Sequence, residues 1–256
     1  MSSVDLSRLT AIVRTCERPR AIARLVASLR RRYPQLRLLV ADDSRQPQPL
    51  EGADWIRLPA DVGVSAGRNA ALARVRTPYF LLLEDAVELT RRTRIEPLLD
   101  LASHSLCDIA AGQYVACRRK LLAFTVRRPD PGYATFEFTD GGLDVRSGHR
   151  AGAEGFLACD LTHNFFVART DKVRAMGGWD PQLLVDEQLE FFVRAQRFGL
   201  RVGVCPEVIA SRWPDQRDAS QAATSRDFTG LALAKIGVAR LVDADGQVRE
   251  ATSRAA

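Results

Sequence analysis

Tyr79-Phe-Leu-Leu-Leu-Glu-Asp85 is the stretch that decides the fold of this 256-residue chain. Its first five residues are continuously apolar, which is typical of a central strand buried on both faces of a parallel sheet. The run ends directly in the acidic pair Glu84-Asp85. Because buried carboxylates are costly unless they are paired or used, we expect a functional site at the end of this strand.

Strands and helices alternate on the N-terminal side of this stretch. Apolar residues after Pro19 recur at intervals of three and four, which predicts an amphipathic helix. The alternation predicts an α/β fold with a mostly parallel central sheet flanked by helices. The predicted strands are Leu9–Val13, Leu36–Ala41 and Trp55–Leu58, and the predicted helices begin at Pro19 and span Ser65–Val75 and Thr93–Ala102.

The pattern changes on the C-terminal side. Antiparallel strands are predicted at Leu121–Val126 and Tyr133–Phe138, around a Pro-Asp-Pro-Gly turn, and the Gly-rich stretch Gly141–Gly155 is predicted to be a mobile loop. The tail after Pro214 has a less regular pattern. No repeat or shift in composition divides the chain, so one domain over residues 1–256 is predicted. The remaining predicted elements are a strand at Asn164–Ala168 and helices at Asp171–Met176 and Asp186–Phe198.

Composition limits the classes of function. A net charge of +6 favours acidic partners such as phosphates and nucleotides, but the arginines are scattered, so no nucleic-acid partner is predicted. Five cysteines without a C-x-x-C pair indicate neither a zinc site nor a disulfide framework, and a reducing cytosol fits them best. No apolar run approaches the roughly 18 residues of a membrane span, and no signal peptide is evident, so a cytoplasmic protein is expected. Peripheral contact with the inner face of a membrane is left open.

Common nucleotide-binding loops are absent after the first predicted strand. A dinucleotide fold needs G-x-G-x-x-G there, whereas this turn reads Thr15-Cys-Glu-Arg-Pro19 without a glycine. The P-loop pattern is also missing. A dinucleotide fold and a P-loop protein are therefore not predicted, and neither is a sugar nucleotidyltransferase, because these share a Gly-rich first loop.

Four ordered motifs resemble family 2-type glycosyltransferases with the GT-A fold. They are Thr10-Ala-Ile-Val-Arg-Thr-Cys-Glu-Arg-Pro19, Leu38-Leu-Val-Ala-Asp-Asp-Ser44, Gly63-Val-Ser-Ala-Gly-Arg-Asn69 and Tyr79-Phe-Leu-Leu-Leu-Glu-Asp85. The second half, with Asn164-Phe-Phe-Val-Ala-Arg-Thr and Leu189-Glu-Phe-Phe192, is similar to the ganglioside-type β-1,4-N-acetylgalactosaminyltransferases and bacterial relatives. The resemblance implies a nucleotide-binding half at about 8–103, an acceptor and catalytic half at about 104–213, and a C-terminal extension at 214–256.

The resemblance implies residues that bind a nucleotide-sugar. Asp43 is expected to accept the imide N–H of uracil, which favours UDP or dTDP donors; the alternative is that Asp42 and Asp43 cap the following turn. Thr15 and Arg18 are expected to pack on the base and ribose. The other predicted donor-binding residues are Arg68, Asn69, Glu84, Asp85 and Arg212. For Arg68 and Asn69 the alternative is a surface arginine with a capping asparagine.

The family's metal site is altered here. Its last acid falls on Ala86, and a histidine that often completes the site falls on Arg212. Asp85 remains the candidate metal ligand, and Mn²⁺ or Mg²⁺ is left open as a cofactor. We expect Arg212 to supply part of the charge that a metal supplies to a departing diphosphate, because guanidinium stays charged and binds phosphate bidentately.

The catalytic base is expected at the start of the helix after Gly178-Trp-Asp-Pro181. The usual base position reads Gln188, so Glu187 is the predicted base, with Asp186 and Glu190 as alternatives. A helix N-terminus keeps a carboxylate ionised and able to accept a proton.

Together these expectations predict transfer of a hexose or N-acetylhexosamine from a UDP- or dTDP-sugar to an acceptor hydroxyl, with inversion. The acceptor class is a saccharide, a lipid-linked molecule or a small molecule. Because Ala86, Gln188 and Arg212 replace expected residues, the alternative is a catalytically degenerate pseudo-glycosyltransferase that binds a nucleotide or a protein partner.

Overall fold

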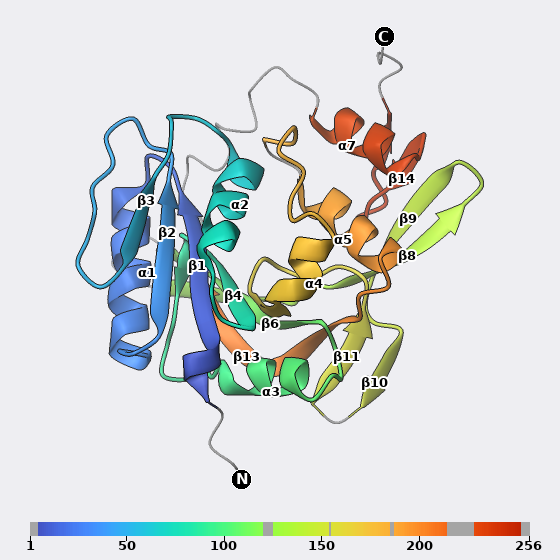
Figure 1. Cartoon of the computed structure of the whole chain (residues 1–256). Coiled ribbons are helices and arrows are strands. Elements are labelled where there is room, and N and C mark those ends of the chain that lie inside the picture. The colour runs from blue at the N-terminus through green and yellow to red at the C-terminus, as the bar shows by residue number, and fades with distance from the viewer. Residues whose placement is uncertain (1–4, 120–124, 154, 185–186, 214–227, 252–256) are drawn as a thin grey trace.

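The computed structural model describes residues 5–119, 125–153, 155–184, 187–213 and 228–251. Within these residues, a large mixed sheet of eleven strands forms the centre, and helices cover both of its faces (Figure 1). Its main path runs β10-β11-β13-β6-β12-β4-β1-β2-β3, while β5 pairs with β13 and β7 pairs with β6. These strands are β1 (Leu9–Thr15), β2 (Arg37–Asp42), β3 (Asp54–Arg57), β4 (Tyr79–Glu84), β5 (Val87–Glu88), β6 (Ile109–Arg119), β7 (Thr125–Asp130), β10 (Ala151–Ala153), β11 (Phe156–Cys159), β12 (Phe166–Arg169) and β13 (Val202–Arg212).

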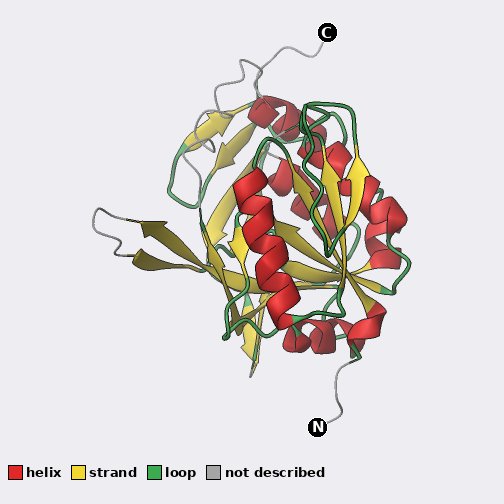
Figure 2. Ribbon diagram, turned by 90° about the vertical axis from the view of Figure 1, so that its left-hand side faces the viewer, coloured by secondary structure: helices red, strands yellow, loops and turns green. Residues whose placement is uncertain are grey.

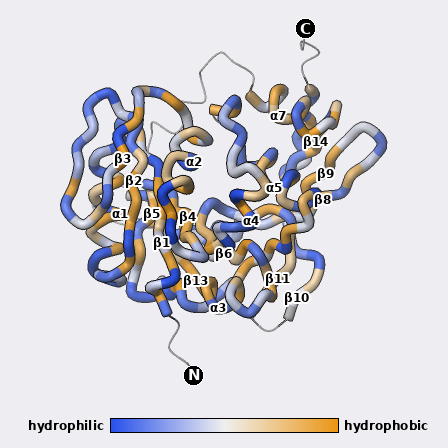
Figure 3. Tube along the Cα trace, in the orientation of Figure 1, coloured by the Kyte–Doolittle hydropathy of each residue, from blue (hydrophilic) through white to orange (hydrophobic). Residues whose placement is uncertain are grey.

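The expectation of a mostly parallel sheet is confirmed for its N-terminal half, and β6 and β13 also pair in parallel, but the whole sheet is mixed. In the N-terminal half β3, β2, β1 and β4 are all parallel, whereas β12 lies antiparallel between β4 and β6. The central strands are mostly hydrophobic along their length (Figure 3). The antiparallel insertion of β12 brings the later strands into the same sheet as the N-terminal strands.

Helices pack on both faces because the strands alternate their side chains. Ile12 of β1 lies in one core, and its neighbours Ala11 and Val13 lie in the other. The helices α1 and α3 cover the second of these faces, and α2, α4, α5 and α7 contribute to the first. Their bounds are α1 (Pro19–Arg32), α2 (Val64–Arg74), α3 (Glu96–Ser103), α4 (Thr170–Ala175), α5 (Glu187–Arg197) and α7 (Phe228–Ile236), with a short 3-10 turn η1 (Leu6–Arg8) before β1.

The amphipathic helix predicted after Pro19 is confirmed. Proline occupies the first position of α1, where its missing N–H costs nothing. The apolar residues at the predicted spacing, Ile22, Leu25, Val26 and Leu29, are all buried against the sheet.

Two predictions for the middle of the chain are wrong. A strand does form at the predicted position 133–138, but it pairs with residues 142–147. The described residues of the other predicted strand, 125 and 126, belong to β7, which pairs with β6, and the two form a ribbon that extends from the sheet at the left of Figure 2. Gly141–Gly155 is not a loop throughout, because it contains β9 (Gly142–Ser147) and β10. Positions 121–124 of the predicted first strand lie outside the described residues.

A second sheet explains why the strand in this Gly-rich stretch escaped detection. It has the order β15-β14-β9-β8, with β8 (Ala134–Thr139), β14 (Arg240–Val242) and β15 (Val248–Glu250). The parallel partner of β9 is β14, almost a hundred residues later in the chain. The tail predicted as less regular therefore supplies α7 and two strands.

Among the described residues, we find no helix whose length and hydropathy suffice to cross a membrane.

Gly112→Ala is expected to destabilise the fold by about 1–3 kcal/mol, because a Cβ at Gly112 meets the Phe165 ring at 2.5 Å and the Val208 carbonyl oxygen at 2.7 Å. Urea denaturation measures this change. Gly152→Ala on the exposed edge strand β10 is the matched control, and it is expected to change stability by about 0.5 kcal/mol or less. Equal effects of the two substitutions would contradict the close packing at Gly112.

Candidate functional site

Strand ends gather polar side chains at one edge of the main sheet. The strand β1 runs parallel to both β2 and β4, and its register places Thr15 beside Asp42 and Arg14 beside Glu84. The late strand β13 pairs with β5, which follows the acidic pair Glu84-Asp85, and this pairing places Arg212 beside Val87. The polar strand ends therefore lie together at this edge, as expected for the carboxyl ends of parallel strands.

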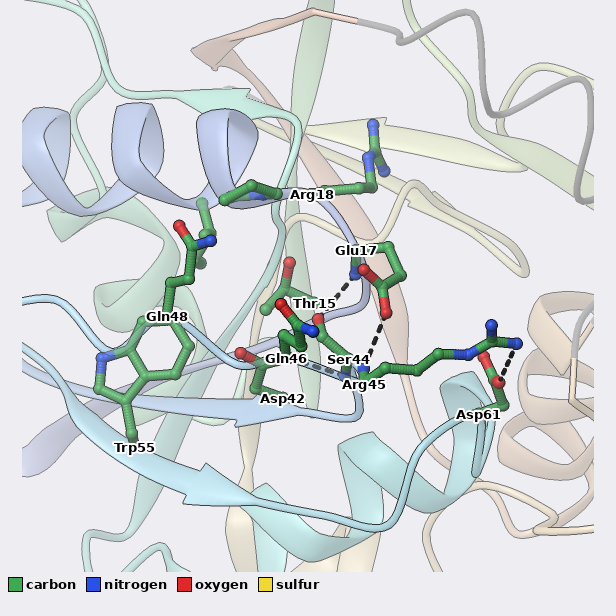
Figure 4. A pocket seen from close by; sticks show the side chains of 12 residues that line it. Thr15, Glu17, Arg18, Asp42, Ser44, Arg45, Gln46, Gln48, Trp55 and Asp61 are labelled. Carbon is green, nitrogen blue, oxygen red and sulfur yellow. Dashed lines mark hydrogen bonds and ion pairs between the residues drawn. The ribbon is translucent and has the colours of Figure 1, made fainter.

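A pocket of about 370 Å³ lies at the ends of β1 and β2 (Figure 4). Trp55, Ile22 and Pro19 give it apolar surface, and the rest of its lining is polar. This combination suits a planar ring with a polar edge. Its lining residues are Thr15, Glu17, Arg18, Pro19, Ile22, Asp42, Ser44, Arg45, Gln46, Gln48, Trp55 and Asp61.

The two aspartates after β2 take different positions. Asp42 lines the pocket and accepts a hydrogen bond from the Ser44 backbone N–H at 2.9 Å, so it caps the turn as the alternative interpretation expected. Asp43 is fully buried, and its Oδ2 accepts from Arg14 at 2.5 Å and from the Gly63 N–H at 3.2 Å. Its Oδ1 is buried without a hydrogen-bond partner among the described residues.

Arg14 is a site residue that the sequence analysis missed. It lies inside the otherwise apolar strand β1 and extends across Gly67, where an added Cβ would meet the Arg14 side chain at 2.5 Å. A charged residue within a buried strand is costly unless it is paired, and this signal was available in the sequence.

Asp85 is held by two partners from the start of the chain. The Thr15 hydroxyl donates to it at 2.9 Å, and Arg18 pairs with it at 2.8 Å. Burial raises the pKa of Asp85 to about 6, although Arg18 and the Thr15 hydrogen bond act in the opposite direction. Arg18 also lines the pocket, so it connects the pocket to the acidic pair.

Glu84 pairs with Arg212, whose Nε donates at 2.9 Å. This contact joins β4 to the end of β13 and places the positive charge of Arg212 at the acidic pair. The hydroxyl of Tyr114 is close to the same charges: burial and the negative charge of Glu84 raise its pKa well above the ordinary value, while Arg212 and Arg68 lower it.

The donor set does not fit the divalent cation that the acidic motif suggests. Glu84 and Asp85 each lie against a guanidinium, and the third position of the motif is Ala86, which has no ligand atom. Within the described part of the chain, no three side chains of the His, Cys, Asp and Glu types are grouped as metal ligands. We derive no step through a metal at Asp85.

Glu187 begins α5 and forms a buried ion pair with Arg68 of α2. The Arg68 guanidinium also lies 5.6 Å from the centre of the Trp179 ring, which is buried in the core. The structure therefore brings a predicted base and a predicted phosphate-binding residue together. Because Arg68 is itself packed against Trp179, the ion pair fixes the position of the Glu187 carboxylate.

Asn69 holds the segment that precedes α5. Its amide donates to the Trp179 carbonyl at 2.6 Å and accepts from the Trp179 N–H at 2.9 Å. Both ends of the side chain are thus engaged with protein backbone. In this structure Asn69 positions Trp179, and its contact with a donor stays a prediction.

The alternative bases differ from Glu187 in their surroundings. Glu190 is buried and paired with Arg194, which also donates to the Met176 and Gly178 carbonyls at 3.0 and 2.8 Å. It therefore helps to hold the loop before α5. Asp186 lies outside the described residues.

Sequence comparison relates the chain to known proteins. The profile for Glycosyl transferase family 2 matches residues 10–154, more than half of the chain. The β-1,4 N-acetylgalactosaminyltransferase 1 of Mus musculus is 34% identical over 212 residues, which is 78% of this chain and 38% of that protein. The Homo sapiens protein of the same name gives the same values, and β-1,4 N-acetylgalactosaminyltransferase 2 of Mus musculus is 32% identical over 210 residues with the same coverage.

Solved structures show the same fold at low identity. GalNAc-T7, crystallised with UDP, GalNAc and Mn²⁺, matches 80% of this chain and 44% of its own with a TM-score of 0.58 and 12% identity. TarS of S. aureus matches 89% of this chain and 39% of its own with a TM-score of 0.59 and 14% identity. The predicted α/β fold of the GT-A type is confirmed. This chain spans less than half the length of the relatives that it matches.

Asp85→Asn removes the charge that pairs with Arg18, and its stability relative to the parent is expected to improve as the pH rises. Since the folded pKa of Asp85 is raised to about 6 from 3.8, its contribution to stability is complete below pH 3.8 and is lost as the pH rises through 6. An amide imitates the protonated carboxyl. The difference in unfolding free energy between variant and parent should grow by about 1–2 kcal/mol between pH 5 and pH 8 in urea denaturation.

The exposed Asp140 provides the control, because Asp140→Asn is expected to give a difference that does not change with pH. A pH-independent difference for Asp85→Asn would show that burial does not control this carboxyl.

Proposed function

This chain belongs to glycosyl transferase family 2, and from that premise we propose that it transfers a hexose or N-acetylhexosamine from a UDP- or dTDP-sugar to an acceptor hydroxyl, with inversion. The matched relatives are named N-acetylgalactosaminyltransferases, and one matched structure contains UDP and GalNAc. UDP-N-acetylgalactosamine is therefore the first donor to test, and a saccharide is the first acceptor class.

The observation that carries this proposal is the position of Arg18. It lines the pocket at the strand ends and pairs with Asp85 at 2.8 Å. A nucleoside in the pocket has its base against Trp55 and its diphosphate toward Arg18. This orientation places the sugar near Glu84 and Arg212, which lie at the same strand edge.

Base selection is proposed to depend on the aspartates after β2. A carboxylate oxygen accepts the imide N–H that uracil and thymine present and that purines do not offer in the same position. Asp43 Oδ1 has no hydrogen-bond partner among the described residues, but Asp43 is fully buried and does not line the pocket, so this role needs the base to reach past the pocket wall. Asp42 lies in the pocket wall and is the competing candidate.

Charge on the departing diphosphate is proposed to be balanced by arginines rather than by a metal. A guanidinium has five N–H donors in a planar fork, so one Arg can contact a carboxylate and a phosphate oxygen together. Arg18, Arg212 and Arg68 are the candidates, and each is already oriented by a carboxylate. Donors held in place before the reaction stabilise developing negative charge without reorganisation.

Glu187 is proposed as the general base. In an inverting transfer the acceptor oxygen bonds to the anomeric carbon while the bond from that carbon to the diphosphate oxygen breaks. The acceptor proton passes to the Glu187 carboxylate, and the nucleoside diphosphate leaves with the bonding electrons. The ion pair with Arg68 keeps the carboxylate oriented during this step.

A reducing, cytoplasmic compartment is proposed from the cysteines. All five are free and buried, which supports a protein that does not depend on disulfides. Contact with the inner face of a membrane stays a prediction.

The protein is expected to bind uracil and thymine nucleotides in preference to purine nucleotides, and this binding is expected not to need a metal ion. UDP and dTDP should raise the melting temperature and GDP and ADP should not, because only a ligand that binds the folded state stabilises it. The shift with UDP should survive EDTA and fall sharply in Arg212→Ala. Asp43→Ala should remove the selectivity for uridine. Thermal denaturation in each nucleotide, with and without Mn²⁺, measures all of these changes.

A strict requirement for Mn²⁺, or unchanged UDP binding in Arg212→Ala, would contradict the role of the arginines. Equal stabilisation by purine nucleotides would contradict the role of Asp43. UDP binding without transfer to any saccharide would favour the degenerate, non-catalytic alternative.

Glu187→Gln is expected to lower transfer by about 10²–10⁴ while UDP binding changes little, because the base acts on the acceptor. UDP release from UDP-N-acetylgalactosamine with a monosaccharide panel measures the rate. Glu190→Gln is the comparison, and it is expected mainly to lower stability, since Glu190 is paired with Arg194. If Glu187→Gln keeps activity while folded Glu190→Gln loses it, the base is Glu190.

A further inference from the structure

A second cavity, of about 470 Å³, lies between α5, α7 and the second sheet. In Figure 1 the labels of α5, α7, β9 and β14 stand together on one side of the molecule. This cavity shares no lining residue with the pocket at the ends of β1 and β2. Its lining residues are Val145, Leu161, Glu187, Gln188, Leu189, Thr229, Ala232, Leu241, Asp243, Ala244, Asp245 and Arg249.

One wall of the cavity is aliphatic. Val145, Leu161 and Leu189 pack against the main core but remain partly exposed, and Ala232 and Leu241 beside them are buried. These side chains come from β9, α5, α7, β14 and the segment before β12. Uncovered aliphatic surface in a concave site favours a ligand with an apolar face.

The rim of the cavity is negatively charged, although the whole chain carries +6. Glu187, Asp243 and Asp245 line it, and Arg249 is the cation among its lining residues. Arg249 lies 3.6 Å from Asp243 and Glu187 is paired with Arg68, so both of these acidic charges are balanced, and Asp245 supplies the net negative charge of the rim. The resulting field opposes an anionic ligand and favours a neutral or cationic one.

The turn that carries the rim is fixed by its own hydrogen bonds. The Asp243 carboxylate accepts from the Asp245 and Gln247 N–H groups at 3.0 and 2.9 Å. Asp245 itself is exposed and forms no ion pair with another described residue. Its charge therefore faces the solvent at the rim and is accessible to a ligand.

Glu187 connects this cavity to the proposed donor site. One of its oxygens pairs with Arg68, and the same side chain lines the cavity. A hydroxyl held in the cavity is therefore within the reach of a carboxylate whose other side faces the phosphate-binding arginines. The cavity is also large enough for one or two rings.

We infer that this cavity binds the acceptor, and that the acceptor carries an apolar ring and no negative charge, with an amine favoured near Asp245. This inference rests on the proposed transferase function and adds the chemical class of its second substrate. The ring lies on the aliphatic wall, and its sugar or hydroxyl end points toward Glu187. A carboxylate or phosphate on the ring is rejected by the acidic rim.

The test uses matched glycosides and UDP-saturated protein in calorimetric titrations. The probes are the methyl, 4-aminomethylphenyl and 4-carboxyphenyl β-glycosides of glucose and of galactose. The aminomethylphenyl compound is expected to bind at least about tenfold more tightly than the methyl glycoside, because a buried ring removes apolar surface from water. The carboxyphenyl compound should bind roughly threefold to tenfold more weakly than the aminomethylphenyl compound at low salt.

Three variants test whether the preference for an aryl ring and the preference for a positive charge arise in this cavity. Asp245→Arg, at an exposed turn, should reverse the charge preference and leave UDP binding unchanged. Leu189→Gln should reduce the advantage of the aryl ring over methyl. Glu51→Arg makes the same charge change at an exposed position that lines neither cavity, and should leave both preferences intact.

The outcomes separate this inference from the proposed function. If UDP binds but the aryl glycosides bind no better than the methyl ones, or Asp245→Arg and Glu51→Arg behave alike, the inference is wrong and the donor site stands. If UDP does not bind at all, the proposed function is wrong. Aryl preference that persists in Leu189→Gln with Asp245→Arg would place the ring elsewhere.

Discussion

Pairing of carboxylates with guanidinium groups at the carboxyl edge of the sheet is the interaction on which this site depends. A buried or half-buried charge is stable only beside an opposite charge, so no member of a pair can be removed without leaving its partner unsatisfied. These contacts also connect elements that the sheet alone does not join: β13 to β4, and α2 to α5. The four pairs are Arg14–Asp43, Arg18–Asp85, Arg212–Glu84 and Arg68–Glu187.

The same pairing changes what the acidic motif can do. With Ala86 in place of an acid and Arg212 beside Glu84, the strand end carries nearly balanced charge instead of an excess of negative charge. In the proposed function, a diphosphate meets oriented guanidinium groups rather than a cluster of carboxylates that needs a cation. Fixed charges of this kind are effective because the protein has already met the cost of holding them in place.

The C-terminal part of the chain forms much of the cavity that Glu187 lines. The helix α7 packs beside α5, and β14 extends the small sheet that begins with β8 and β9. Together they leave aliphatic side chains facing a cavity with an acidic rim. Glu187 thus pairs with Arg68 and also lines this cavity, which suits the proposed transfer between two chemically different substrates.

Sequence alone determined the α/β alternation and the polar ends of β1, β2 and β4, because local periodicity and the carboxyl ends of parallel strands follow from nearby residues. It also marked Glu84, Asp85 and Glu187 as site residues. Only the tertiary structure decided which arginine holds which acid, since the pairs join residues from 29 to 128 positions apart. The strand β9 was hidden because it lies in a Gly-rich stretch, and its pairing with the preceding β8 and with β14 from the far end of the chain is seen only in the folded sheet.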